Sequence, residues 1–474
     1  MTIKETYTGL YSQQAFLNSL NFLGFGPDVH IDKRHNKITF ADPNDARNAI
    51  VIDTKDLDVH NGQITSGTIV DVHAVIGGKD AVTLTGASID ATQLNSSLSG
   101  DVSGLYDALV GGLHGNIVAT GDKFGNILEI GQGGKATVDA GGGNDLLEIW
   151  HAKNAVIDGG TGADTIDFNS YFGFPSPPVS VATVDLAAGT GTNPYGGTLT
   201  INNIENLDNF IGTSDFRGDG QDNDFRGGSH ADTFIGRGGD DEISIWINVS
   251  ADPRATVVDG GSGKDTLVAQ LSDAPAAPMS GSGDSLRLLN RLDLLHPEDN
   301  TGTFHGGTFK HLEVFRVNGF LNKNVFDFSG TSASEHVFSA GSDDPLNGRG
   351  GDDLLYGADG ADILTGGSGA DTFQYRAATE SAANPALRDT VTDFSHAQHD
   401  RIDLHLIDAD TTGGGNDKFK FMNSGGFDGH AGEVYAERAN GDTFVFADTN
   451  GDKAPDLVIL VDGGPKLAEG DFIL

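Results

Sequence analysis

The sequence predicts an all-β fold: a parallel β-roll, or β-helix-like solenoid, between a β-rich N-terminal region and a C-terminal β cap. Three observations support this prediction. Glycine supplies 68 of the 474 residues, nonamers on the frame G-G-x-G-x-D-x-U-x (U is apolar) recur in tandem, and aspartates recur at steps of nine and 18 residues. Self-similarity at a short fixed period is the sequence signature of a solenoid.

The nonamers form two tandem runs and several single copies. In chain order they are AGGGNDLLE (140–148), GGTGADTID (159–167), GDGQDNDFR, GGSHADTFI and GRGGDDEIS (218–244), GGSGKDTLV (260–268), a degenerate GTSASEHVF (330–338), SAGSDDPLN (339–347), and GRGGDDLLY, GADGADILT and GGSGADTFQ (348–374). Near-perfect tandem copies such as those at 348–374 rarely arise by chance, so we treat them as one structural unit repeated.

Each position of the nonamer has a structural reason. Glycine permits positive φ and a close approach of the backbone, so the first six residues can turn tightly. The turn directs backbone carbonyls inward, and the aspartate at position six adds a carboxylate. Residues seven to nine form a short strand whose apolar position eight enters the core. Each nonamer supplies one turn and one strand, so two nonamers complete a coil of 18 residues.

Turns on the same edge of the roll should therefore stack when their aspartates lie one coil apart. The pairs with this spacing are Asp344 with Asp362 and Asp353 with Asp371 (18 apart), Asp145 with Asp164 (19 apart), Asp241 with Asp265 (24 apart, one coil plus an insertion) and Asn223 with Asp241. Hard cations such as Ca²⁺ take six to eight oxygen ligands. We expect the stacked carboxylates and carbonyls to enclose Ca²⁺.

The predicted ligands lie in the turns of the nonamers. They are Asp145, Asp164, Asp232, Asp241, Asp265, Asp344, Asp353, Asp362 and Asp371, then Gly348, Gly350, Gly357, Asp359, Gly366 and Ser368 at first and third turn positions, with Asp222 and Asn223 as further candidates.

The charge and composition exclude several classes of protein. Lys and Arg number 29 against 68 Asp and Glu, which gives a formal net charge of −39, and cysteine is absent. A disulfide-stapled scaffold is therefore excluded. The negative charge repels phosphate backbones and anionic membranes, so we expect no nucleic-acid partner. With neither a basic stretch leading an apolar segment at the N-terminus nor a run of 18 apolar residues, neither a Sec-type signal peptide nor a membrane span is predicted.

The nonamers resemble those of the RTX (repeats-in-toxin) family. The resemblance covers about 131–474. It includes 181–214, which resembles the spacers between RTX blocks, and 309–332 looks like a degenerate second copy of that spacer. GGTGAD aligns with GGSGKD 101 residues later, which suggests an internal duplication. The resemblance implies a calcium-filled parallel β-roll secreted through a type I (ABC) exporter, and hence an extracellular protein, either free or associated with the cell surface.

The last 100 residues are similar to the non-catalytic C-terminal domain of serralysin-type secreted proteins. In that family this stretch caps the roll and carries the export signal. Asp471-Phe472-Ile473-Leu474 matches the family's acid followed by three apolar residues. The resemblance also implies that Asp400 and Asp403 close the last site of the roll.

One further acidic turn has the spacing of the first ligands of an EF-hand loop. Asp448, Asn450, Asp452 and Asp456 read D-x-N-x-D-x-x-x-D. The sixth position is Lys453 rather than glycine and the twelfth is not glutamate, so a complete EF-hand is not expected. Calcium binding and a solvated turn both remain open for this segment.

No recognisable catalytic constellation is present in the sequence. H-E-x-x-H, G-x-S-x-G, a P-loop and a dinucleotide fingerprint are all missing. His396 and His399 have no glutamate between them, and GDSL at 283–286 lies between repeat blocks. Asp71 with His73, or Asp58 with His60, could serve a sugar-modifying β-helical enzyme, or be polar residues of a strand surface. We therefore expect a non-catalytic protein, with catalytic residues unknown.

The sequence predicts three parts: a β-rich N-terminal region of unknown role (1–130), the β-roll (131–375, with insertions near 168–217 and 269–329), and the cap with the secretion signal (376–474). The expected function is calcium binding by a chain that folds outside the cell, in adhesion, a surface layer, biofilm or host interaction. Self-assembly and cell-surface polysaccharide are the further partners considered. A polysaccharide lyase or epimerase and an RTX toxin or bacteriocin are the alternatives.

Overall fold

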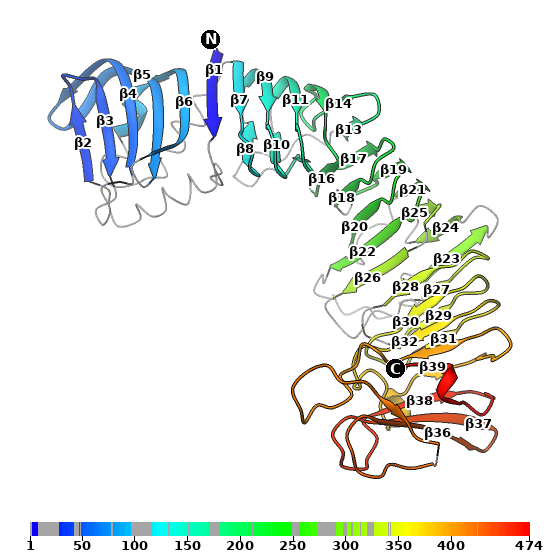
Figure 1. Ribbon diagram of the computed structural model, residues 1–474. Coiled ribbons are helices and arrows are strands. Elements are labelled where there is room, and N and C mark those ends of the chain that lie inside the picture. The colour runs from blue at the N-terminus through cyan, green and yellow to red at the C-terminus, as the bar shows by residue number, and fades with distance from the viewer. Residues whose placement is uncertain are drawn as a thin grey trace, which may run out of the picture. The chain divides into compact units, whose positions relative to one another are not determined.

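The structure is a computed structural model that confirms the all-β solenoid class (Figure 1). It describes residues 2–7, 28–41, 47, 49–76, 79–95, 116–130, 133–149, 152–169, 181–210, 212–228, 230–248, 256–272, 291–296, 301–304, 307–312, 314–319, 327–339, 341, 343–423 and 425–474. Its helical elements are short 3-10 turns: η1 (Ala91–Asn95), η3 (Pro385–Leu387) and η4 (Glu469–Asp471). Among these residues no helix is long and apolar enough to cross a membrane.

The chain divides into two compact units. Unit 1 contains Met1–Asp219 and Asn223–Gly227, and unit 2 contains Gly220–Asp222 and Gly228–Leu474. Each unit contains strands of two sheets, here named sheet A and sheet B. The predicted boundaries at residues 130 and 375 remain predictions.

Sheet A of unit 1 begins as an antiparallel meander and continues as a parallel stack. Its strands in spatial order are β2 (Asp28–Asp32), β3 (Lys37–Ala41), β4 (Ala49–His60), β5 (Gln63–Ile76), β6 (Lys79–Asp90), β1 (Thr2–Tyr7), β7 (Asn116–Thr120), β9 (Gly133–Asp139), β11 (Ala152–Asp158), β15 (Thr198–Asn202), β14 (Thr190–Thr192), β13 (Val181–Asp185) and β17 (Thr213–Arg217). Strand β1 makes the change of direction, because it pairs antiparallel with β6 and parallel with β7.

Sheet B of unit 1 is parallel throughout. Its strands are β8 (Ile127–Ile130), β10 (Leu146–Ile149), β12 (Thr165–Asp167), β16 (Asn206–Asn209) and β18 (Asp224–Gly227). The chain alternates between the two sheets, so each nonamer turn links a strand of one sheet to a strand of the other, as the repeat predicts.

Unit 2 repeats this plan. Its sheet A contains β19 (Thr233–Gly238), β21 (Val257–Ser262), β25 (Gly307–Lys310), β24 (Thr301–Phe304), β23 (Arg291–His296), β27 (Asp327–Ser329), β29 (Pro345–Asn347), β31 (Ile363–Thr365), β33 (Thr390–Val391), β38 (Leu457–Val461), β37 (Asp442–Asp448), β36 (Glu433–Ala439) and β35 (Lys420–Phe421). Its sheet B contains β20 (Glu242–Asn248), β22 (Thr266–Ser272), β26 (Val314–Gly319), β28 (His336–Phe338), β30 (Leu354–Tyr356), β32 (Thr372–Gln374), β34 (Arg401–Asp403) and β39 (Phe472–Ile473), all parallel.

The same detour interrupts sheet A in both units. In unit 1 the order runs β11–β15–β14–β13–β17, and in unit 2 it runs β21–β25–β24–β23–β27. In each case the strand pairs around the middle strand are antiparallel and the outer pairs are parallel. Two copies of so specific a pattern support the internal duplication that the sequence suggests.

The core of the roll is a single file of position-eight side chains from each sheet. Leu147, Ile166 and Leu355 are at most 1% exposed. The in-register pairing of Leu147 with Ile166 places these side chains directly above one another. Position-seven and position-nine side chains point outward, because successive side chains of a strand alternate between its faces.

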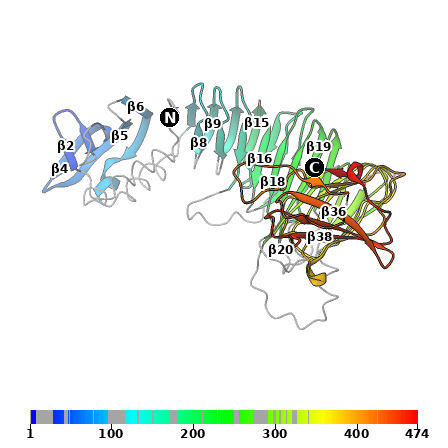
Figure 2. The ribbon, with the colours of Figure 1, turned by 60° about the horizontal axis from the view of Figure 1, so that its bottom comes forward.

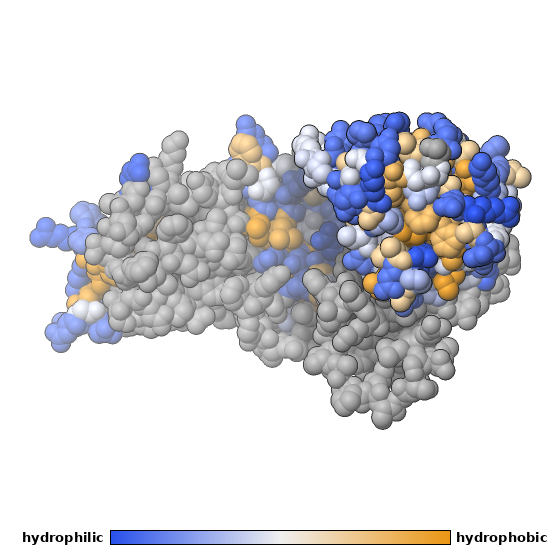
Figure 3. All heavy atoms as spheres, turned by 90° about the horizontal axis from the view of Figure 1, so that it is seen from below, coloured by the Kyte–Doolittle hydropathy of each residue, from blue (hydrophilic) through white to orange (hydrophobic). Residues whose placement is uncertain are grey.

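The cap closes both sheets of unit 2 (Figure 2). Strand β38 pairs parallel with β33, the last roll strand of sheet A, and continues into the antiparallel β36–β37–β38 meander. Strand β39 pairs parallel with β34, the last roll strand of sheet B. Figure 3 shows apolar residues gathered on the cap face of unit 2, within a hydrophilic border. Covering the last strands protects edges that would otherwise pair with other chains.

We predict that Leu355→Ala lowers the free energy of unfolding by about 2–5 kcal/mol, because it leaves a cavity in the single-file core. Ile363→Ala is the matched control, since Ile363 sits at position seven of the next nonamer and is 51% exposed. Urea unfolding in saturating calcium measures both. Equal losses for the two variants would contradict the single-file core.

Candidate metal centre

The position-six aspartates form hydrogen-bonded ladders along the edges of the roll. In each step, one carboxylate oxygen, Oδ1, accepts the backbone N–H of the position-six residue one coil earlier in the sequence. Four of the five predicted pairs do this, at N···O distances of 2.8 Å (Asp145 to Asp164), 2.9 Å (Asp241 to Asp265), 2.8 Å (Asp344 to Asp362) and 2.9 Å (Asp353 to Asp371), while the pairing of Asn223 with Asp241 stays a prediction. The spacings of 18, 19 and 24 residues therefore correspond to stacked turns.

The second carboxylate oxygen of these residues identifies the site. In five aspartates, each at most 2% exposed, Oδ2 is buried and has no hydrogen-bond partner among the residues that the structure describes; they are Asp145, Asp164, Asp353, Asp362 and Asp371. Buried carboxylate oxygens without a partner are strongly disfavoured unless a cation compensates them. A row of them, repeated coil after coil, fits the oxygen-rich site that a hard divalent cation requires.

The electrostatics of the ladder point the same way. Burial raises the pKa of Asp145 to about 7 and that of Asp371 to about 6. Burial also raises the pKa of Asp353 and Asp362, and the neighbouring acids in the stack raise both further. Desolvation and mutual repulsion both disfavour the ionised ladder, so the folded turns favour either protons or a bound cation. At neutral pH a cation such as Ca²⁺ is the better fit to paired carboxylates.

Glycine at position one makes room for the carboxylate of its own turn. A Cβ on Gly348 would lie 2.1 Å from Oδ2 of Asp353, and one on Gly357 would lie 2.1 Å from Oδ2 of Asp362. These distances are far below van der Waals contact. Position one is therefore glycine because the buried carboxylate oxygen Oδ2 occupies the space that a side chain would need.

Glycine at position four has a different role. Gly369 has φ of +137°, and a Cβ there would lie 1.8 Å from the carbonyl oxygen of Gly351 in the preceding coil. Gly350 and Ser368 form a parallel bridge between the same two coils. Close stacking of the turns thus requires the glycines of the nonamer, and it brings their carbonyls to the edge where the carboxylates lie.

The remaining predicted turn residues vary in burial. Asp232 and Asp265 are buried, whereas the side chains of Asp359 and Ser368 are exposed. Asp222 is exposed and its Oδ1 accepts the N–H of Asp240 at 2.7 Å, so it links position five rather than position six. Gly366 is buried beside Oδ2 of Asp371, as Gly348 is beside Asp353.

Asn223 occupies position six but uses its amide. It is 3% exposed, its Nδ2 donates to the carbonyl of Glu205 at 3.0 Å and its Oδ1 accepts the N–H of Asp219. An amide satisfied in this way replaces the carboxylate of the ladder without adding charge.

Four ladder members were not foreseen. Oδ1 of Asp389 accepts the N–H of Asp362, Oε2 of Glu205 accepts the N–H of Asp164, and the N–H groups of Asn126 and Glu335 donate to Asp145 and Asp353. Glu335 stands at position six of the degenerate nonamer 330–338, so its frame position could have revealed it. Asp389 and Glu205 follow insertions that break the nine-residue step.

Asp400 extends the ladder, while Asp403 takes another place. Oδ1 of Asp400 accepts the N–H of Asp371 at 3.1 Å and its Oδ2 accepts the N–H of Ser395. Asp403 lies on strand β34, where its carboxylate accepts hydrogen bonds from Gln374 and contacts His405. Calcium binding by either residue remains a prediction.

The acidic turn at 448–456 is closed by its own hydrogen bonds. Asp448 accepts the N–H groups of Asn450, Gly451 and Lys453, and Asp456 accepts Thr449 N–H and the side-chain amide of Asn450. Asp452 is exposed, and its Oδ1 accepts the N–H of Ala454. These bonds describe a self-supporting turn, and a role in calcium binding stays a prediction.

The residues considered for catalysis lie in ordinary polar contacts. Nε2 of His73 lies 3.5 Å from Asp53, Asp58 pairs with Lys33, and Nδ1 of His396 lies 2.7 Å from Oδ1 of Asp471. GDSL at 283–286 lies outside the described residues. Within the described chain, these contacts assemble no nucleophile with a base.

We predict that Gly348→Ala weakens calcium binding and lowers calcium-dependent stability, because the new methyl group meets the Asp353 carboxylate. Gly414→Ala is the control, since no atom lies within 4 Å of its Cβ position. Calorimetric calcium titration and urea unfolding measure both effects. Calcium affinity equal to that of the wild type in Gly348→Ala would argue against a metal-binding role for Oδ2 of Asp353.

Comparisons with known proteins agree with the site. The family described as "Peptidase M10 serralysin C terminal" matches residues 212–474, and the RTX calcium-binding nonapeptide repeat matches residues 153–170. None of the curated proteins matches the chain.

Three solved structures are similar in part. The AlgE6R3 and AlgE6R2 subunits of the Azotobacter vinelandii mannuronan C5-epimerase are 26% identical over 31% of this chain, with 78% and 85% of their own lengths covered and TM-scores of 0.24 and 0.23. The extracellular lipase LipA from Serratia marcescens is 12% identical over 98% of this chain and 86% of its own, with a TM-score of 0.21.

The repeat match shows that the protein binds Ca²⁺, and the repeat and serralysin matches together show that it is secreted. The larger match covers more than half of the chain. The chain therefore belongs to the Peptidase M10 serralysin C terminal family.

Proposed function

We propose that this protein is a non-catalytic calcium-binding β-roll that folds only when it meets calcium outside the cell. Its role there would be structural: adhesion, a surface layer, biofilm matrix or host contact. The observation that supports it best is the ladder of buried carboxylates, because each Oδ2 without a partner makes the folded chain depend on a cation.

The dependence follows from linkage. An ion that binds the folded chain and not the unfolded one stabilises the folded state in proportion to its concentration over Kd. Extracellular calcium modules have Kd values of about 10⁻⁴–10⁻³ M, so low calcium inside a cell leaves such a chain unfolded. The net charge of −39 adds repulsion to the same state.

The fold buries the first two residues of the proposed export signal, while Ile473 is exposed. Phe472 is 5% exposed, pairs with Ile402 across β34 and β39 and lies 5.3 Å from the Phe421 ring. Asp471 contacts His396 and its Oδ2 accepts the N–H of Ala468. An exporter would need to read Asp471–Leu474 in the unfolded chain, which supports export before folding.

Circular dichroism of the full chain tests the folding proposal. In EGTA we expect a spectrum with little β-structure, and addition of calcium should produce the β-sheet spectrum in a cooperative transition. Magnesium at the same concentration is the control, because it demands a tighter octahedral site. A spectrum unchanged by calcium would refute the proposal.

Removal of Asp471–Leu474 tests the export proposal. In a host with a type I exporter we expect the truncated protein to remain inside the cell, because the exporter finds no signal. His396→Ala is the comparison, since it loosens the folded contact to Asp471 and leaves the signal intact, so secretion should persist. Secretion of the truncated chain at the level of the wild type would refute this assignment.

A further inference from the structure

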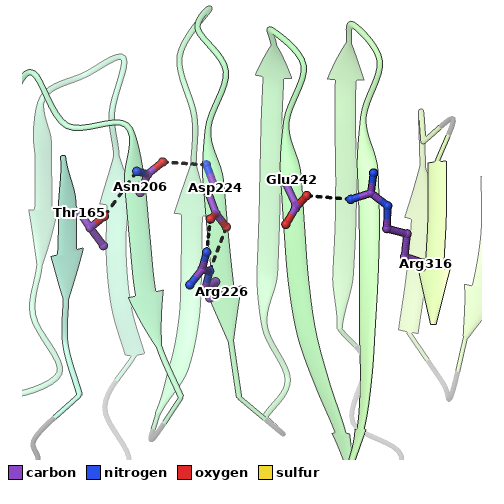
Figure 4. Close-up of polar contacts among 6 residues, drawn as sticks. All are labelled: Thr165, Asn206, Asp224, Arg226, Glu242 and Arg316. Carbon is purple, nitrogen blue, oxygen red and sulfur yellow. Dashed lines mark hydrogen bonds and ion pairs between the residues drawn. The ribbon is translucent and has the colours of Figure 1, made fainter. Parts of the chain in front are cut away.

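A second row of acids lies on the outer face of sheet B in unit 1, apart from the turns. Glu148 is in register with Asp167, and Asp167 is in register with Asp208, on the neighbouring parallel strands β10, β12 and β16. These residues point outward, because Leu147, Ile166 and Leu207 beside them fill the core. Figure 4 shows the adjoining part of this face. Thr165, Asn206 and Asp224 form the neighbouring in-register row there, two residues earlier on their strands.

The first two acids of the row are buried although they face outward. Glu148 is 8% exposed and Asp167 is 6% exposed. Among the described residues Glu148 has no hydrogen-bond partner, and burial raises its pKa to about 7. Asp167 accepts the N–H of Asn169 at 2.6 Å and also interacts with the Asn169 side chain, yet burial and the charge of Glu148 raise its pKa.

Among the residues that the structure describes, no basic side chain forms an ion pair with Glu148 or Asp167. Asp208, the third acid, receives Nδ2 of Asn169 at 2.9 Å and lies near the Arg226 charge. Arg226 is itself bonded to Asp224 at 2.6 Å. Glu148 and Asp167 are thus left with two negative charges side by side in a buried setting, which is strongly unfavourable without a counter-ion.

Outward acids elsewhere on the same kind of face are compensated. In unit 2, Oε2 of Glu242 lies 3.3 Å from Nη1 of Arg316, and both side chains are more than 40% exposed (Figure 4). Burial and the lack of a basic partner therefore distinguish Glu148 and Asp167 from an ordinary charged strand surface.

We propose that the carboxylates of Glu148 and Asp167 together bind one divalent, oxygen-preferring cation, of which Ca²⁺ is the available example, at a site separate from the turn ladder. Neighbouring strands lie about 4.8 Å apart, and calcium–oxygen distances are about 2.3–2.6 Å. One ion between the two carboxylates therefore satisfies both. A proton shared by the two carboxylates and a bound sugar substrate are the alternatives to a cation. Burial of both acids disfavours access by a sugar polymer.

The experiment counts calcium per chain in the full-length protein. Equilibrium dialysis against saturating calcium, with the metal measured by atomic emission, is applied to the wild type, Glu148→Gln, Asp167→Asn and the double variant. Each single variant should lose one ion, and the double variant should lose no more than that, because the ion is shared. Glu242→Gln is the matched control for an outward acid of sheet B and should lose none.

Asp164→Asn separates the new site from the nearest turn. If the sites are independent, Asp164→Asn combined with Asp167→Asn loses one ion more than Asp164→Asn alone. Three outcomes would each overturn the proposal. They are an unchanged calcium count in both single variants, a loss of two ions in the double variant, and the same count for Asp164→Asn with and without Asp167→Asn. If one single variant does not fold to the wild-type circular dichroism spectrum in calcium, the calcium count of the other single variant tests the proposal. Either substitution removes one of the two carboxylate ligands.

Urea unfolding in saturating calcium gives a second readout. There both substitutions should destabilise the chain, because each removes a ligand of the bound ion. A sugar-binding or proton-sharing role would leave the calcium count unchanged, and that outcome also overturns the proposal.

Discussion

The roll depends on the two oxygens of a single aspartate carboxylate being in different environments. In Asp145, Asp164, Asp353, Asp362 and Asp371, one carboxylate oxygen accepts the backbone N–H of the preceding coil, and the other is buried without a hydrogen-bond partner among the described residues. The first contact sets the spacing of the coils. The second makes that spacing unfavourable until a cation arrives, so architecture and metal binding rest on the same atoms.

Glycine serves this arrangement in two distinct ways. At position one it clears space for the carboxylate, as Gly348 does for Asp353, and at position four it lets adjacent turns approach, as Gly369 does against Gly351. The glycines and the aspartates of the nonamers are therefore two aspects of one turn. The detour of three antiparallel strands, present once in each unit, shows that the roll tolerates insertions wherever the turn itself is preserved.

Much of the fold followed from periodicity, and the misses have physical causes. A nine-residue step with an apolar position eight predicts the stacked turns and the file of Leu147 and Ile166. It cannot find Asp389, which continues the ladder after an interruption of 27 residues, because chain length between coils is not fixed by pairing. Nor can it separate Glu148 from a solvated strand residue, since burial on the outer face depends on tertiary contacts and leaves no trace in the repeat.

The direction of the ladder bonds gives the ladder a polarity. In every step the amide belongs to the earlier coil and the accepting carboxylate to the later one, from Asn126 through Asp145 and Asp164, and from Glu335 through Asp353 and Asp371 to Asp400. The position-five acids run the opposite way: Asp343 and Asp352 accept the amides of Ala361 and Ala370 in the next coil. Each coil is thus held by its predecessor as well as by its successor, and in a nearest-neighbour, one-dimensional system of this kind order formed in one coil can spread to either side.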